Sequence, residues 1–227
     1  MTHTDAIQIP IPDRAAAGRA LVPMLLAYRQ RPEAIVLALP RGGVPVAYEI
    51  AMALEIRLDL MLVRKLGLPS HEELAMGAIA SGGVLVVNRD VVKMHGIDEA
   101  TLNAVAQREL LELQRRERVY RAKHPLPDLR GQQVILVDDG LATGATMRAA
   151  VRAARSQGAA RIVVAVPVAP DDTVAELRRE VDEVVCPFVP DWFVAIGRWY
   201  VDFFQTTDQE VIDLLQRAWG AGQHGTS

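Results

Sequence analysis

The sequence predicts an α/β fold in which helices flank both faces of a parallel sheet. Short apolar runs rich in β-branched residues alternate along the chain with segments of helical periodicity, which is typical of repeated strand–helix units. Several of these runs are continuously apolar, which indicates strands that are covered on both faces. Half of the 227 residues are hydrophobic and only 5% are aromatic, so we expect a core of Val, Leu, Ile and Ala. At this length one domain, residues 1–227, is favoured over two.

The elements follow from these runs in order. Strands are predicted at residues 34–39, 58–63, 84–88, 134–137, 161–167 and 181–185, and helices at residues 44–54, 99–123, 146–157 and 171–180. Before the first strand, Asp13 can cap a helix that Pro23 should start, end or kink. Near the C-terminus, Thr207 and Glu210 have the spacing of a capping box before a further helix.

Residues 108–123 allow two interpretations. They carry six Lys or Arg against three Glu, which is compatible with a basic binding helix. However, Glu112 with Arg116 and Glu117 with Arg121 form i,i+4 pairs in the favourable order, beside an apolar face. We therefore favour a solvated amphipathic helix.

Residues 134–146, reading VILVDDGLATGAT, carry the strongest functional signal. Four apolar residues lead into Asp138 and Asp139 at the carboxyl end of a predicted strand, where open α/β sheets bind their ligands. The next turn offers backbone N–H groups and hydroxyls at a helix start, which favour a phosphate. The residues of this turn are Ala142, Thr143, Gly144, Ala145 and Thr146. The order of these groups predicts a site for a sugar phosphate.

Other interpretations of this segment fit less well. Lys does not follow Gly144, so the spacing of a P-loop is absent. The two acids are adjacent, whereas an aspartyl-phosphate phosphatase needs them alternating. The remaining alternative is a plain strand end with a solvated turn.

A second strand-to-helix turn follows residues 34–39. Arg41 supplies a fork of donors suited to phosphate oxygens, and Gly42 and Gly43 allow a ligand to approach the backbone closely. Alone, this sequence is more often an ordinary turn, and its value comes from lying at the same sheet edge as Asp138.

Two further segments are candidates. Arg64 and Lys65 follow a predicted strand end and could meet a pyrophosphate, although Lys65 is about equally well read as a solvated strand end. Residues 66–77 could then form a mobile stretch that closes over the site, in which Glu72 and Glu73 are more simply exposed charges than general bases.

An aromatic segment near the C-terminus can bind a planar ring. Trp192, Phe193 and Val194 combine aromatic rings with accessible backbone, which suits stacking on a base. The later aromatic residues are interpreted as packing, namely Trp199, Tyr200, Phe203 and Phe204.

These motifs resemble those of type I phosphoribosyltransferases, and of a bacterial branch of that family over nearly the full length. The resemblance implies a Rossmann-like parallel sheet at residues 34–185 with a small hood from residues 1–33 and 186–220. It implies that Asp138 and Asp139 hold the ribose hydroxyls and that residues 142–146 cradle the 5′-phosphate of phosphoribosyl pyrophosphate. It further implies that Arg41, Gly42 and Gly43 form the pyrophosphate loop, often with a cis peptide at the bond matching 40–41.

The resemblance extends to the remaining candidates and to the chemistry. Adenine phosphoribosyltransferases carry a similar Arg–Lys pair, and purine transferases use a comparable Phe–Val segment. The family implies Mg²⁺ as cofactor, reached by Asp138 or Asp139 through water or substrate, and a homodimer. Transferases for 6-oxopurines have Asp where this chain has Ala142, so a 6-oxopurine acceptor is disfavoured and the acceptor is left open.

Composition excludes several other classes. A net charge of −3 and a pI near 6.0 give no general attraction to nucleic acid or anionic membranes. Cys186 is the single cysteine and the five histidines show no ligand spacing, so a cysteine- or histidine-built metal site is not expected. We find neither a signal peptide nor an apolar run of the ~20 residues needed to span a bilayer, and expect a cytoplasmic protein.

The leading hypothesis is a Mg²⁺-dependent phosphoribosyltransferase that uses phosphoribosyl pyrophosphate and a nitrogenous acceptor. The alternative is a non-catalytic regulatory protein that senses phosphoribosyl pyrophosphate or a nucleotide. A sugar-phosphate hydrolase is disfavoured because no Ser or Cys is placed as a nucleophile.

Overall fold

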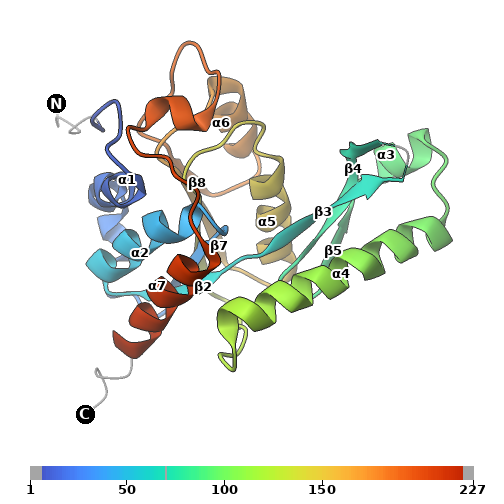
Figure 1. Cartoon of the computed structure of the whole chain (residues 1–227), viewed down its shortest axis with the longest axis horizontal. Coiled ribbons are helices and arrows are strands. Elements are labelled where there is room, and N and C mark those ends of the chain that lie inside the picture. The colour runs from blue at the N-terminus through green and yellow to red at the C-terminus, as the bar shows by residue number, and fades with distance from the viewer. Residues whose placement is uncertain (1–6, 70, 222–227) are drawn as a thin grey trace.

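Five parallel strands form the central sheet, in the order β2–β1–β6–β7–β8. A computed structural model describes residues 7–69 and 71–221 (Figure 1). The sheet consists of β1 (Ala34–Ala38), β2 (Arg57–Leu60), β6 (Gln133–Val137), β7 (Arg161–Ala165) and β8 (Glu183–Val185). The predicted α/β class and parallel sheet are confirmed, with boundaries within a few residues of those expected.

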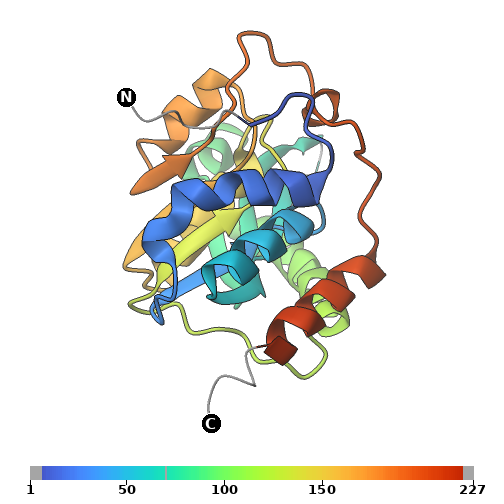
Figure 2. The ribbon, with the colours of Figure 1, turned by 90° about the vertical axis from the view of Figure 1, so that its left-hand side faces the viewer.

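Helices cover both faces of this sheet. One face carries α1 (Arg14–Leu21), a 3₁₀ helix (Val22–Tyr28), α2 (Gly43–Leu54) and α7 (Asp208–Ala221), and the other carries α5 (Ala145–Ser156) and α6 (Asp171–Leu177). Figure 2 shows α1 and α2 lying across the sheet. The helix predicted at residues 171–180 therefore ends earlier than expected. Pro23 lies in the first turn of the 3₁₀ helix, directly after α1 ends.

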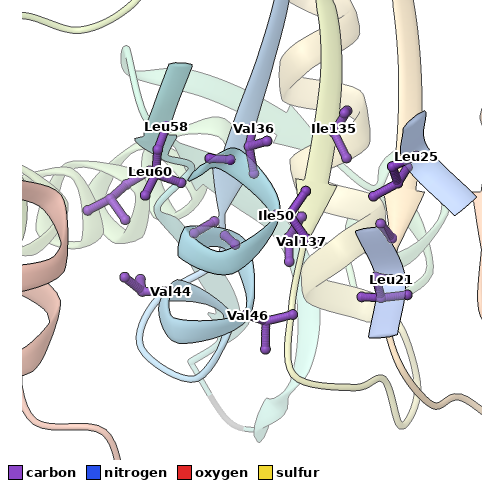
Figure 3. Packing of buried hydrophobic residues seen from close by; sticks show 14 of the residues in the cluster. Leu21, Leu25, Val36, Val44, Val46, Ile50, Leu58, Leu60, Ile135 and Val137 are labelled. Carbon is purple, nitrogen blue, oxygen red and sulfur yellow. The ribbon is translucent and has the colours of Figure 1, made fainter. Parts of the chain in front are cut away.

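Alternate residues of each central strand enter two different cores. Val36 and Ile135 belong to a core with residues of α1, α2 and α7, and Figure 3 shows them with Leu21 of α1 and Ile50 of α2. Ile35 and Val134 belong to a second core with residues of α5 and α6. All four strand side chains are buried. Burial on both faces explains why the strands are continuous apolar runs.

The first and last parts of the described chain meet above the sheet. The N–H of Ile11 donates to the carbonyl of Trp199 at 2.7 Å, and the N–H of Val201 donates to the carbonyl of Ile11 at 2.8 Å. A short 3₁₀ helix (Ile196–Trp199) lies in this part.

A protruding arm, residues 63–121, departs from the predicted fold (Figure 1). It contains an antiparallel sheet of β3 (Val63–Leu68), β4 (His71–Ala80) and β5 (Val84–Val87), followed by α3 (Arg89–Met94) and α4 (Glu99–Arg121). The strand predicted at residues 58–63 is thus two strands, and the strand predicted at 84–88 belongs to the second sheet.

Residues 66–77, over the part described, form most of a hairpin and not an irregular stretch, and their closure over the site stays a prediction. Leu66, Leu68 and Met76 are buried in a third apolar core together with Val105 of α4. Register shifts on either side of Gly67 accommodate the glycine within the strand. The side chains of Glu72 and Glu73 lie outside the described part.

The helix α4 is amphipathic, as predicted, but only one of its two predicted ion pairs forms. Arg116 Nε lies 2.9 Å from Glu112 Oε1. Arg121 is not paired with Glu117 and instead contacts Asp59 of β2. The end of α4 is therefore fixed to the central sheet.

The capping box before α7 is confirmed and gives a first prediction. The N–H of Thr207 donates to Glu210 Oε2 at 2.7 Å, and the N–H of Glu210 donates to Thr207 Oγ1 at 3.2 Å. Replacing Thr207 with alanine should lower the free energy of unfolding by about 1 kcal/mol, because a helix N–H loses its acceptor. Urea denaturation measures this loss. Thr207→Ser retains the hydroxyl, and an equal loss in that variant would contradict the capping role.

Candidate functional site

The two predicted ligand turns lie side by side because β1 and β6 are adjacent parallel strands. The N–H of Leu39 donates to the carbonyl of Val137 at 2.8 Å, which ties the two strand ends together. The Pro40–Arg41 peptide bond is cis, as the family resemblance implies.

The turn after β1 needs both Gly42 and Gly43, because its backbone lies against the end of β6. A Cβ on Gly42 would lie 2.1 Å from Asp139 Oδ2, and a Cβ on Gly43 would lie 2.6 Å from the carbonyl oxygen of Val137. Any larger residue would displace the acidic strand end, so the Arg–Gly–Gly sequence and the two acids form one packed unit.

The adjacent carboxylates differ in their partners. Asp139 is 8% exposed, and its Oδ2 accepts a hydrogen bond from Arg14 Nε at 2.7 Å. The Tyr200 hydroxyl donates to the backbone carbonyl of Asp139 at 2.7 Å. Asp138 Oδ1 instead accepts the N–H of Asp139 at 2.9 Å, and within residues 7–69 and 71–221 no cation forms an ion pair with Asp138.

These surroundings shift the protonation of both acids. Burial raises the pKa of Asp138 well above its ordinary value, and the neighbouring charge of Asp139 adds to this effect. Burial also raises the pKa of Asp139, although Arg14 acts in the opposite direction. A cation or hydroxyl donors from a ligand would stabilise the charged form of both.

The predicted phosphate turn lies at the start of α5. Gly144 has φ +66° and precedes the helix, and a Cβ there would lie 2.8 Å from the Cγ2 methyl of Thr173. The Thr173 hydroxyl donates to the carbonyl of Ala142 at 2.7 Å, which fixes the turn. Ala142 and Thr143 are exposed, and Ala145 and Thr146 are half-buried in the first turn. The left-handed glycine therefore presents the N-terminus of α5 to solvent.

A cavity of about 450 Å³ opens beside these turns and collects residues from five parts of the chain. Arg41, Gly42 and Asp139 of the predicted site line it. Arg14 and Pro40 also line it. The helix α4 adds Arg115, Arg116, Val119 and Tyr120. The segment that leads into α7 adds Phe203, Gln205, Thr206 and Asp208.

Asp208 links the walls of this cavity. Its Oδ1 accepts a hydrogen bond from the Tyr120 hydroxyl at 2.7 Å and lies 3.4 Å from Arg41 Nη1. Burial, followed by the hydrogen bond to Asp208, raises the pKa of Tyr120 to about 12. The cavity therefore carries four guanidinium groups against two carboxylates, which suits an anionic ligand.

Arg64 and Lys65 do not line this cavity. They lie within β3 and not at a strand end, and Arg64 Nη2 is 2.6 Å from Glu109 Oε2 of α4. Lys65 is exposed and lines a second cavity, of about 170 Å³, with Ala145 and two arginines of α5. The structure thus places Lys65 beside the phosphate turn and away from Asp139.

The aromatic segment lines neither cavity. Trp192 is 81% exposed and Val194 is 63% exposed, while Phe193 is half-buried. The expectation that all later aromatics serve packing was wrong for Phe204, which is 83% exposed. Phe203 lies with its ring centroid 4.1 Å from Arg14 Cζ, so it packs on a site residue.

Sequence reasoning missed most of the residues that enclose the cavity, including Arg14, Asp208 and the residues of α4. Arg14 follows a capping Asp and gave no sign of reaching Asp139. The basic stretch around Arg115 and Arg116 did give a signal, which the solvated-helix interpretation set aside. Tyr120 completes the same helix face.

The described residues contain no group of three or more His, Cys, Asp or Glu side chains arranged to hold a metal ion. Asp138 and Asp139 nevertheless supply carboxylate oxygens, which are the ligands that Mg²⁺ prefers, and two acids leave most of its octahedral shell to substrate and water. No helix within the described ranges is long and apolar enough to cross a membrane.

Comparison with known proteins gives one consistent family. The sequence pattern of the phosphoribosyl transferase domain matches residues 14–203, most of the chain. Rv0571c of Mycobacterium tuberculosis strain H37Rv, a candidate phosphoribosyl transferase, is 49% identical over 207 residues, which are 91% of this chain and 46% of that protein. MT0597 of strain CDC 1551 / Oshkosh matches to the same extent. This chain therefore spans about half the length of its mycobacterial relatives.

A solved structure agrees with the fold. The crystal structure of TT1426 from Thermus thermophilus is similar with a TM-score of 0.82 and 41% sequence identity, covering 91% of this chain and 98% of that one.

Proposed function

Because the chain belongs to the phosphoribosyl transferase domain family, we propose that it transfers the phosphoribosyl group of phosphoribosyl pyrophosphate to a nitrogenous acceptor. In this reaction the C1′–oxygen bond to pyrophosphate breaks and a C1′–nitrogen bond forms. The observation that carries the proposal is the packing of the Asp138–Asp139 strand end against the Arg41–Gly42–Gly43 turn, beside one arginine-rich cavity.

The proposed roles follow from these positions. Asp138 and Asp139 hold the ribose hydroxyls, and the turn of Ala142, Thr143, Gly144, Ala145 and Thr146 binds the 5′-phosphate with backbone N–H groups at the start of α5. Arg41, Gly42 and Gly43 bind the pyrophosphate. Positive charge develops on the ribose as pyrophosphate leaves, so positioning and a fixed electrostatic environment supply most of the catalysis.

The family typically uses Mg²⁺, which when bound neutralises charge on the pyrophosphate. Asp138 and Asp139 are the residues that would hold it, through water or through ribose oxygens. Before the ligand arrives, Arg14 neutralises Asp139.

The remaining candidates concern the acceptor base and the arm. Ala142 is the exposed first residue of the phosphate turn and offers no carboxylate to a base, which disfavours 6-oxopurines. Lys65 of the arm remains a candidate for binding the phosphates of the donor, because it lines one cavity with Ala145 at the start of α5. Arg64 is a weaker candidate, because it forms an ion pair with Glu109. We also retain Trp192, Phe193 and Val194 as an acceptor surface that needs no rearrangement to be reached by a planar ring.

Calorimetry with Mg²⁺ and phosphoribosyl pyrophosphate tests the proposal directly. We expect saturable binding, and release of pyrophosphate when a panel of bases and amines is added. Absence of donor binding would overturn the proposal. Donor binding without turnover by any acceptor would instead favour a regulatory sensor of the same ligand.

A further inference from the structure

Two arginines of the arm face the pyrophosphate turn across the main cavity. Arg115 and Arg116 lie on α4 and line the cavity together with Pro40, Arg41 and Gly42. They are far from Arg41 along the chain and come from a different sheet-and-helix unit. The two arginines therefore belong neither to the turn of Arg41, Gly42 and Gly43 nor to the turn at residues 142–146.

The two arginines share one carboxylate. Arg115 Nε lies 2.7 Å from Glu112 Oε2 and Arg116 Nε lies 2.9 Å from Glu112 Oε1. Glu112 does not line the cavity, and two guanidinium groups on one carboxylate leave a positive charge in excess. Their side chains are 59% and 43% exposed, so each can turn its remaining N–H groups to a ligand.

Among the described residues, the cavity has two other cations, Arg14 and Arg41. Arg14 is engaged by Asp139 and by the carbonyl of Phe204 at 2.6 Å. Arg41 approaches Asp208 only at 3.4 Å and is the one cation of the pyrophosphate turn. A diphosphate ester carries about two to three negative charges near neutral pH, one on the inner phosphate and about 1.5 to 2 on the terminal phosphate, whose second proton is weakly acidic. Arg41 and the backbone N–H groups meet only part of that charge, and bound Mg²⁺ would share the rest with other cations of the cavity wall.

The helix that carries the arginines is held in place at its end. Arg121 Nη2 donates to the carbonyl of Leu60 at 2.8 Å, and the Tyr120 hydroxyl donates to Asp208 at 2.7 Å. A guanidinium on a fixed helix forms bidentate bonds to phosphate oxygens with little loss of freedom.

We propose that Arg115 and Arg116 bind the pyrophosphate end of the donor, opposite Arg41, so that the arm supplies one half of the leaving-group site. This inference rests on the proposed function, since it takes phosphoribosyl pyrophosphate as the ligand of the cavity.

The test compares three ligands on one double variant. Arg115→Ala with Arg116→Ala should weaken Mg²⁺-dependent binding of phosphoribosyl pyrophosphate and of inorganic pyrophosphate by about tenfold for each arginine lost. Binding of ribose 5-phosphate, which lacks the diphosphate, should change less than about twofold, because only screened long-range charge is altered. Calorimetry measures all three affinities.

Arg118→Ala is the matched control. Arg118 lies on the same helix and is exposed, its Nε donates to the carbonyl of Gln114 at 3.3 Å, and it does not line the cavity. It should leave all three affinities unchanged, and the melting temperature of each variant checks that the fold is intact.

The outcomes separate the two proposals. If the wild-type protein binds no phosphoribosyl pyrophosphate, the proposed function fails and this inference fails with it. If the wild type binds the donor and the double variant binds it equally well, only this inference is overturned. An equal loss of affinity for ribose 5-phosphate also overturns it, because the arginines would then act on the whole site and not on the diphosphate.

Discussion

Replacing Arg121 with alanine is expected to lower the free energy of unfolding by about 3–5 kcal/mol, because it leaves a buried carboxylate without its cation. Arg121 and Asp59 are each 4% exposed and form a direct ion pair between the last turn of α4 and β2. The Asp59 carboxylate also accepts the N–H of Leu60 at 2.7 Å, but this single hydrogen bond does not compensate for the lost cation. Urea denaturation at pH 7 measures the loss.

The destabilisation should depend on pH with a defined sign. Burial raises the pKa of Asp59, against the opposing effects of Arg121, of the Leu60 N–H and of His124, whose Nε2 lies 4.0 Å from Asp59 Oδ2, so removing Arg121 raises that pKa further. A carboxyl whose folded pKa lies above its unfolded pKa favours folding when protonated, and this stability is lost as the pH rises through the folded value. The deficit of Arg121→Ala should therefore shrink as the pH falls from 7 toward the ordinary range of an Asp.

Two further variants isolate the ion pair. Arg118→Ala, three residues earlier on the exposed side of α4, should change the free energy of unfolding by less than about 0.5 kcal/mol. Arg121→Met combined with Asp59→Leu should recover most of the loss, because an apolar pair of similar volume replaces the ion pair. A loss in that double variant as large as in Arg121→Ala would show that packing, and not the unpaired charge, is responsible.

The Arg121–Asp59 ion pair is an example of why the arm was not predicted from the sequence. Pairing of Glu117 with Arg121 is the local solution that spacing indicates, but Asp59 lies 62 residues away and is reached only by tertiary packing. Within the arm, Gly67 and Pro69 have the character of loop residues, while the alternation of buried Leu66 and Leu68 is too short to outweigh them. Their burial depends on α4, which follows much later in the chain.

The candidate site likewise contains residues that local sequence predicts and residues that only tertiary packing brings together. Asp138 and Arg41 could be predicted as neighbours because each follows an apolar strand, and parallel strands end at one edge of a sheet. Arg14 and Arg116 approach that edge on helices whose placement depends on caps, ion pairs and core contacts distant in sequence. A local motif therefore identifies the centre of the site but not the residues that enclose it.

Replacing Asp138 with asparagine is expected to move stability and binding in opposite directions. Donor binding should weaken by about tenfold to a hundredfold, the effect of losing hydrogen bonds to a charged carboxylate, and by about a hundredfold or more when Asp139→Asn is added. Calorimetry with Mg²⁺ and phosphoribosyl pyrophosphate measures the affinity.

Stability should rise in the same single variant. Burial and the charge of Asp139 raise the pKa of Asp138, so its ionised form opposes folding at pH 7 and an amide removes that cost. The gain should fade as the pH falls through the raised pKa, because wild-type Asp138 then becomes neutral as well. Asp191→Asn, an exposed carboxylate on the loop after β8, should alter neither property.

The opposite signs distinguish a binding carboxylate from a structural one. Asp139→Asn alone should not stabilise the protein, because it leaves Arg14 without the partner that lies 2.7 Å away. If Asp138→Asn instead destabilised the protein, Asp138 would be a structural acceptor for the N–H of Asp139, and reduced binding would follow from a disturbed turn. A more stable variant with weakened binding requires that the chain retains the half-buried Asp138 beside the buried Asp139 at the end of β6 for the ligand, at a cost to its own folding.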